Sequence, residues 1–173
     1  MKNIVLIGMS GVGKTTVGKV LATELNKNFF DTDILIETKF KISIEKIFSL
    51  YGETYFRELE SKVIEEISNK ENLIISTGGG TILDENNITR LKKNGILILL
   101  DSSINNIVNN LKCSMVNRPL LNDKKGIYNK VKLMYNNRKD LYQSAADYII
   151  LVDNKSINEI VFEIRDIYDK INY

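Results

Sequence analysis

Histidine is absent from this chain of 173 residues, and cysteine and proline occur once each. The lack of histidine excludes Ser-His-Asp triads, histidine metal sites and a histidine general base, so any acid–base step falls to Asp, Glu, Lys or Tyr. The single Cys113 can form neither an internal disulfide nor a cysteine-built zinc site. Together with the lack of a signal peptide, this cysteine usage predicts a reducing, cytoplasmic location.

An excess of charge and long hydrophobic runs are also missing. The net charge is only +2, from 24 basic and 22 acidic residues, which argues against nucleic acid and against an anionic membrane as partners. No apolar run approaches the roughly 20 residues that span a bilayer. The length and the 43% hydrophobic content predict one domain over residues 1–173 with its own core, and we expect a monomer.

The stretch GMSGVGKTT at residues 8–16 fits the phosphate-binding pattern G-x-x-x-x-G-K-[ST]. Its glycines allow a row of backbone N–H groups to approach phosphate oxygens. Lys14 can reach the β- and γ-phosphates, and the Thr15 hydroxyl can ligate Mg²⁺ at the start of a helix whose dipole favours anions. The apolar run over residues 3–7 predicts a buried parallel strand, and the periodicity over residues 14–26 predicts that helix.

Two carboxylates, Asp31 and Asp33, follow a short aromatic run that predicts a second strand. Because the carboxyl ends of parallel strands face the ligand crevice, both acids are expected near the phosphates. Asp31 could hold Mg²⁺ directly or through water, and Asp33 could accept a proton or bind a substrate hydroxyl. The alternative is that one of them only caps a helix beginning near Ile34. Beside a phosphate loop we favour the functional interpretation.

Arg57 and the segment Thr77-Gly78-Gly79-Gly80 are further candidates for a binding site. Arg57 either pairs in solvent with Glu53 or Glu60, which is worth little, or makes a bidentate bond to a substrate carboxylate. The glycine triplet follows a predicted buried strand, and three consecutive glycines are costly in backbone entropy. At the end of a central strand they indicate backbone that passes close to a bound ligand.

The remaining chain alternates helix and strand patterns. Helices are predicted near residues 43–67, 84–94, 104–111, 127–142 and 157–167, and strands near 73–76, 96–100 and 148–152. Gly95 is predicted to end the second of these helices. The polar, basic segment 112–125 has no clear periodicity and is typical of a mobile lid, in which Arg118 could fold over the γ-phosphate. The pattern predicts an α/β fold, a three-layer α/β/α sandwich around a five-stranded parallel sheet.

Several stretches resemble the motifs of shikimate kinases, within the nucleoside-monophosphate-kinase-like P-loop kinases. In chain order they are GMSGVGKTT, DTD at 31–33, FRELE at 56–60, TGGG at 77–80 and RPLL at 118–121. A further stretch, RKDLY at 138–142, is similar to the family's R-x-P-L-Y with Asp140 in place of proline. The resemblance covers nearly the whole chain. It implies transfer of the ATP γ-phosphate to the 3-hydroxyl of shikimate, in aromatic amino acid (chorismate) biosynthesis, and the sheet order 2-3-1-4-5.

The resemblance also implies roles for individual residues. ATP would lie against Gly11, Val12, Gly13, Lys14, Thr15, Thr16, Arg118 and Lys155. Shikimate would be held by Asp33, Arg57, Gly79 and Arg138, with the substrate-binding helices over residues 34–62. The cofactor Mg²⁺ would be bound by Thr15 and, through water, by Asp31. The catalytic residues would be Lys14, Asp33 and Arg118, where Asp33 acts as the base or orients the hydroxyl.

Two alternative functions use the same phosphate loop. A related small-molecule P-loop kinase, such as a gluconate kinase, would be separated by substrate competition and by Arg138→Ala kinetics. A nucleotide-binding switch module would carry the guanine motif N-K-x-D. The nearest match, residues 137–140, has arginine in the lysine position.

Overall fold

The computed structural model describes residues 2–115 and 124–172, and its centre is a parallel sheet of five strands. The strands are β1 (Asn3–Ile7), β2 (Asn28–Asp31), β3 (Leu73–Ser76), β4 (Gly95–Asp101) and β5 (Tyr148–Leu151). Their order is β2-β3-β1-β4-β5, which confirms the predicted α/β fold and sheet order. The central strand β1 pairs with both β3 and β4, and all its residues are buried, which explains its unbroken apolar sequence.

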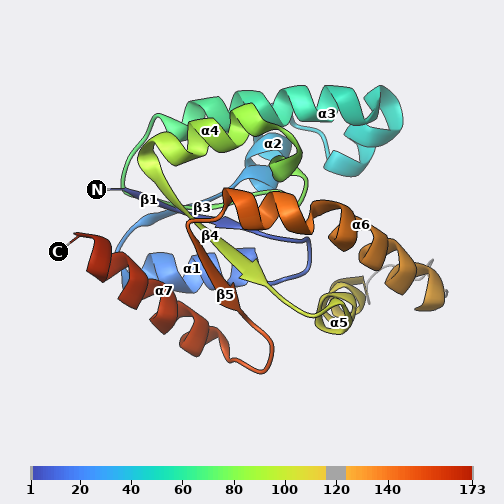
Figure 1. Cartoon of the computed structure of the whole chain (residues 1–173). Coiled ribbons are helices and arrows are strands. Elements are labelled where there is room, and N and C mark those ends of the chain that lie inside the picture. The colour runs from blue at the N-terminus through green and yellow to red at the C-terminus, as the bar shows by residue number, and fades with distance from the viewer. Residues whose placement is uncertain (1, 116–123, 173) are drawn as a thin grey trace.

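Helices cover both faces of the sheet (Figure 1). They are α1 (Lys14–Glu24), α2 (Thr32–Phe40), α3 (Ile44–Ser68), α4 (Glu85–Asn94), α5 (Ile104–Met115), α6 (Lys124–Ala145) and α7 (Ile157–Asn172), with a short 3₁₀ turn η1 at Thr81–Leu83. Ile4 and Leu6 pack with α1 and α7 on one face, whereas Val5 and Ile7 pack with α3, α4 and α6 on the other. Because side chains alternate along a strand, β1 contributes to both cores.

A third, smaller core lies between α2 and the first part of α3. Ile36, Ile47 and Phe56 are its buried centre. Gly52 interrupts α3 with φ 80° and ψ 176°, a backbone conformation that favours glycine, so the helix is kinked at this residue. In Figure 1, α2 and the first part of α3 lie toward one end of the molecule. Helices α5 and α6 approach the loop after β1 at the same end.

Several helix ends differ from the predictions. Helix α5 continues through residue 115 and α6 begins at 124, so both ends of the predicted lid segment 112–125 are helical. Polar residues can extend a helix that an apolar face has already nucleated, because propagation adds one hydrogen bond for each residue ordered. Residues 116–123, with Arg118, lie outside the described part of the chain.

Helix α4 ends at Asn94 with Gly95 as its C-cap residue, which confirms the prediction that Gly95 ends this helix. Gly95 has φ −131° and ψ 160°, an extended conformation, and it is the first residue of β4. Its missing side chain is needed for space, since a Cβ would lie 2.6 Å from the carbonyl oxygen of Leu91. Among the described residues, no helix combines the length and apolar character needed to cross a membrane.

Candidate active site

Two adjoining cavities lie where β1, β2 and β3 end. The larger has a volume of about 640 Å³ and the smaller about 340 Å³. Ser10, Asp33 and Gly79 line both cavities. Because these residues are shared, molecules bound in the two cavities would meet at this junction.

The predicted phosphate loop forms one wall of the larger cavity. Gly8, Gly11 and Gly13 have φ values of 139°, 86° and 105°, which residues with a side chain rarely adopt. This backbone leads directly into α1, whose first residue is Lys14. The predicted ATP-binding residues that line this cavity are Gly11, Val12, Gly13, Lys14, Thr15, Thr16 and Lys155. The loop and the helix N-terminus together suit an anionic ligand.

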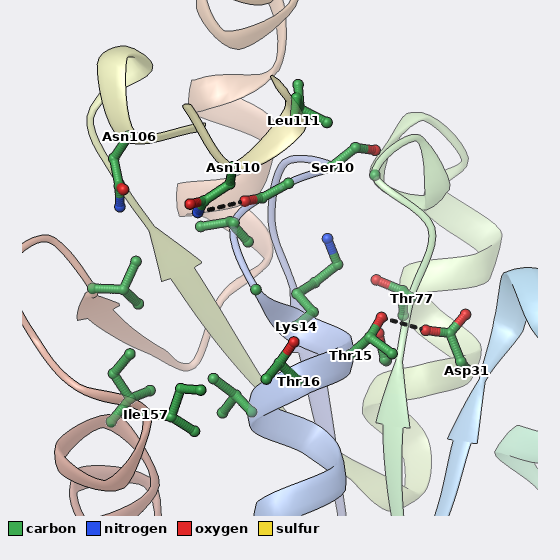
Figure 2. Close-up of a pocket in the computed structure, with 18 of the residues that line it drawn as sticks. Ser10, Lys14, Thr15, Thr16, Asp31, Thr77, Asn106, Asn110, Leu111 and Ile157 are labelled. Carbon is green, nitrogen blue, oxygen red and sulfur yellow. Dashed lines mark hydrogen bonds between the residues drawn. The ribbon is translucent and has the colours of Figure 1, made fainter. Parts of the chain in front are cut away.

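The Lys14 side chain is buried inside this loop, with only 6% of its surface exposed. Its ammonium group donates to the carbonyl oxygens of Gly8 at 2.7 Å and Met9 at 2.9 Å. Burial lowers the pKa of Lys14 to about 8, against the opposing effect of Asp33 and Asp31. Figure 2 shows the side chain on the concave side of the loop, where phosphate oxygens would lie.

The two oxygens of the Asp31 carboxylate have different partners, so its cap of α2 leaves one oxygen facing Thr15. Its Oδ1 accepts hydrogen bonds from the backbone of Asp33 at 3.0 Å and Ile34 at 3.3 Å, which caps α2. Its Oδ2 accepts from the Thr15 hydroxyl at 2.7 Å, and Figure 2 shows the two side chains facing each other. A hydroxyl beside a carboxylate is an oxygen donor set that fits Mg²⁺, which usually keeps water and phosphate ligands as well.

The site contains little other metal-binding capacity. Within the described residues, no group of three or more His, Cys, Asp or Glu side chains could hold a metal ion. Thr15 and Asp31 supply two oxygen atoms, which suits an ion that takes its remaining ligands from water or a bound anion.

Asp33 lies in the first turn of α2 at the junction of the cavities. Within the described part of the chain, its Oδ1 is buried and has no hydrogen-bond partner. Burial raises the pKa of Asp33 to about 6, assisted by Asp31 and Glu60 and opposed by Lys14 and Arg57. A buried carboxylate oxygen without a donor is costly by itself, so this atom is well suited to accept from a ligand hydroxyl.

Arg57 lines the smaller cavity and is fixed by two carboxylates of its own helix. Its guanidinium donates to Glu60 at 2.6 Å and to Glu53 at 3.1 Å. The predicted pairing is present, but the idea that it is merely a solvated pair is wrong, because Glu60 is fully buried. Glu60 also accepts a hydrogen bond from the hydroxyl of Thr81 at 2.6 Å, so the segment that follows β3 holds the carboxylate as well.

Arg138 reaches the same cavity from α6. Its Nη1 donates to the carbonyl oxygen of Gly79 at 3.1 Å, and the hydroxyl of Tyr142 donates to the same oxygen. Tyr142 is almost completely buried and stands one helical turn after Arg138. The smaller cavity thus carries guanidinium groups from two different helices, an arrangement that suits a carboxylate ligand.

The glycine triplet is crowded mainly by the protein's own side chains. A Cβ at Gly78 would lie 2.7 Å from Oδ1 of Asp33, and one at Gly79 would lie 2.5 Å from Oγ of Ser10. The N–H group of Gly78 already donates to the hydroxyl of Thr32 at 2.9 Å. All three glycines line the smaller cavity, so the expectation that this backbone passes close to a ligand stays a prediction, and space for neighbouring side chains is a second reason for glycine here.

Sequence reasoning missed several residues of the larger cavity. They are Ser10, Ser76, Asn106, Asn110, Leu111, Val152, Ile157 and Ile160. Asn110 donates to the carbonyl oxygen of Gly11 at 2.9 Å, and a Cβ at Gly11 would lie 2.7 Å from Leu111 (Figure 2). The four-residue spacing of Asn106 and Asn110 places them on one face of α5, but nothing local indicates that this face meets the loop.

The structure brings the described candidates together around the two cavities. Arg57 and Arg138 line only the smaller cavity, whereas Lys155 lines only the larger one and pairs with Glu163 at 2.7 Å. The predicted catalytic residue Arg118 is outside the described residues.

Comparisons with known proteins point to one family. The family model described as shikimate kinase matches residues 10–169. The chain is 47% identical to the shikimate kinase of Sulfurihydrogenibium sp. over 164 residues, covering 95% of this chain and 96% of that protein. It is 42% identical to the shikimate kinase of Alkaliphilus oremlandii, covering 95% of this chain and 97% of that protein.

A solved structure shows the same similarity in three dimensions. The shikimate kinase from Acinetobacter baumannii in complex with shikimate superposes with a TM-score of 0.90 at 32% sequence identity. The match covers 98% of this chain and 94% of that chain.

Proposed function

This chain belongs to the shikimate kinase family, and we propose that its larger cavity binds ATP while its smaller cavity binds shikimate. The chain is an ATP-dependent kinase that transfers the γ-phosphate to the 3-hydroxyl of shikimate, giving shikimate 3-phosphate and ADP. The observation that carries the assignment of cavities is their junction at Ser10, Asp33 and Gly79. Transfer needs donor and acceptor in contact, and this junction is where the two bound molecules would meet.

We assign the shikimate carboxylate to the two guanidinium groups. Arg57 and Arg138 line the smaller cavity from α3 and α6, and each can form charge-assisted hydrogen bonds with a carboxylate. With the carboxylate there, a ring hydroxyl can point toward the junction. The unpartnered oxygen of Asp33 then accepts its hydrogen bond, and Asp33 either takes the proton or orients the hydroxyl.

Lys14 and the backbone of the phosphate loop bind the phosphates of ATP in this proposal. The ammonium group of Lys14 would exchange its bonds to the Gly8 and Met9 carbonyls for phosphate oxygens. Phosphoryl transfer depends chiefly on alignment and on stabilising charge, so a site without histidine can carry it out.

Kinases of this family generally need a divalent metal ion, and we propose Mg²⁺. Thr15 and Asp31 would hold it, with Asp31 acting through water, since their oxygens lie 2.7 Å apart beside the loop. The bound ion would neutralise charge on the phosphates. We also propose a monomer acting in the cytoplasm, where a single unpaired cysteine is usual.

A coupled ADP-release assay tests the function. The assay contains ATP and Mg²⁺ with shikimate, with gluconate or with no acceptor, and compares the natural chain with Asp33→Asn and Arg138→Ala. We expect ADP release only with shikimate. Asp33→Asn should lower the rate by about 10²-fold or more, and Arg138→Ala should raise the KM for shikimate. ADP release that needs no acceptor would favour a nucleotide-binding switch, and release only with gluconate would favour a gluconate kinase.

A further inference from the structure

Gly80, the last glycine of the triplet, lies against the guanidinium group of Arg57. A Cβ at Gly80 would lie 2.5 Å from Nη1 and 2.6 Å from Cζ of Arg57, distances that real Cβ atoms essentially never show. The guanidinium therefore occupies the space that any side chain at this position would take. None of the hydrogen bonds described above for Arg57 involves Gly80, so the contact between the two residues is purely steric.

The backbone does not explain why this residue is glycine. Gly80 has φ −101° and ψ −3°, which other residues adopt readily. This distinguishes it from Gly11 and Gly13, whose φ values of 86° and 105° favour glycine whatever the surrounding space. The space that Gly80 leaves open is thus the physical reason for glycine here.

The other contacts of Arg57 come from its own helix. Glu60 and Glu53 accept from the guanidinium, and the ring of Phe56 lies 5.1 Å from its Cζ. Glu53 is well exposed, so its bond restrains the arginine weakly. Gly80 belongs instead to the loop after β3 and approaches the guanidinium from outside α3.

We propose that Gly80 is a positioning residue for Arg57, whose guanidinium can bind the acceptor only because position 80 has no side chain. The proposal rests on the proposed function, in which Arg57 binds the shikimate carboxylate. A methyl group at position 80 displaces the guanidinium and spoils its bidentate geometry, because the planar donor pair must face both carboxylate oxygens. The fold tolerates this change because the crowded atoms are the far end of a side chain, although the displaced guanidinium weakens its bond to the buried Glu60.

The test compares Gly80→Ala, Arg57→Ala and the double variant by steady-state kinetics and thermal unfolding. We expect Gly80→Ala to raise the KM for shikimate about tenfold, with the KM for ATP unchanged and the melting temperature lowered no more than in Arg57→Ala, which removes the partner of Glu60 entirely. Arg57→Ala should raise the KM for shikimate by at least as much. The double variant should match Arg57→Ala, because the added methyl group then has no guanidinium to displace.

Leu83→Ala is the matched control, since Leu83 is exposed in the same loop and lines neither cavity. Its kinetics should equal those of the natural chain. An unchanged KM for shikimate in Arg57→Ala would overturn the assigned role of Arg57, and the positioning role with it. A raised KM in Arg57→Ala with none in Gly80→Ala would overturn only the positioning role.

Two further outcomes would also overturn the positioning role. If Gly80→Ala raised the KM of the Arg57→Ala variant by its full factor, the methyl group would act directly on the substrate. If Gly80→Ala raised both KM values together or lowered the melting temperature by more than Arg57→Ala does, its effect would be a general change in the loop.

Discussion

The hydroxyl of Thr15 donates to Oδ2 of Asp31 at 2.7 Å, while Oδ1 of the same carboxylate caps helix α2. One carboxylate therefore joins the start of α1 to the start of α2. The helix cap and the proposed metal binding use different atoms of Asp31, so substitutions can separate the two contributions.

Asp31→Asn keeps an oxygen that can cap α2 but removes the charge. We expect its free energy of unfolding to stay within about 0.5 kcal/mol of the natural chain, whereas Asp31→Ala loses about 1 kcal/mol with the cap. Both variants should need roughly tenfold more Mg²⁺ for half-maximal activity. Denaturant unfolding and a Mg²⁺ titration at constant ATP measure the two effects. An unchanged Mg²⁺ requirement in both variants would remove Asp31 from the proposed metal site.

Asp33 should make stability depend on pH in a defined direction. Its pKa in the folded chain is raised from 3.8 to about 6, so the native state binds the proton more tightly than the unfolded state. The contribution of Asp33 to stability is therefore largest below about pH 4, falls as the pH rises to about 6 and is then level, with a loss of at most about 3 kcal/mol. Asp33→Asn should abolish this contribution. Unfolding curves for the natural chain and Asp33→Asn from about pH 4 to pH 8 would show it as a difference in the free energy of unfolding that changes with pH.

The activity should depend on pH in the direction opposite to the Asp33 contribution to stability. If the ionised Asp33 carboxylate accepts the hydrogen bond of the acceptor hydroxyl, kcat/KM for shikimate decreases as the pH falls below about 6. A pH–rate profile from about pH 5 to pH 8 measures this decrease. A flat profile would show that the charge of Asp33 is not needed.

Lys14 should couple ATP binding to proton uptake. Its pKa is about 8 in the ligand-free chain because of burial, and the phosphates of ATP favour the charged ammonium. ATP affinity should therefore fall with rising pH above about 8, by at most about tenfold per pH unit. Calorimetric titrations in two buffers of different ionisation enthalpy would show proton uptake near pH 8. Lys14→Met is the control, and it should bind weakly at every pH with no such uptake.

Tyr142→Phe should weaken the acceptor site without affecting the nucleotide. The hydroxyl of Tyr142 shares the Gly79 carbonyl oxygen with Arg138, so its removal takes one of two observed donors from that oxygen. We expect a loss of about 1 kcal/mol in the free energy of unfolding and a rise of about threefold in the KM for shikimate. The KM for ATP should not change. An equal rise in both KM values would contradict a specific effect on the smaller cavity.

Much of the fold could be predicted because its signals are local. The apolar run of β1, the glycine loop and the stripe of α1 identify a strand, a turn and a helix within about 25 residues. The ends of α5 and α6 could not be predicted in the same way. Their polar terminal turns carry no periodic signal, although the backbone hydrogen bonds continue.

The candidate site was predictable to a smaller extent. The loop residues and Asp31 follow from a motif and from its position after a strand, so the sequence could propose them alone. For Arg57, spacing named Glu53 and Glu60 as partners but could not show that Glu60 is buried. That burial depends on Thr81 and on the loop after β3, more than 20 residues further along the chain.

Local sequence by itself determined which segments become strands, helices and glycine turns, because periodicity and backbone freedom act over a few residues. Only the tertiary structure decided which side chains share a cavity. Ser10, Asp33 and Gly79 meet because three parallel strands end at one edge of the sheet. Likewise, Gly80 adjoins Arg57 because packing brings the loop after β3 against α3, and no local pattern encodes a space that two distant segments create together.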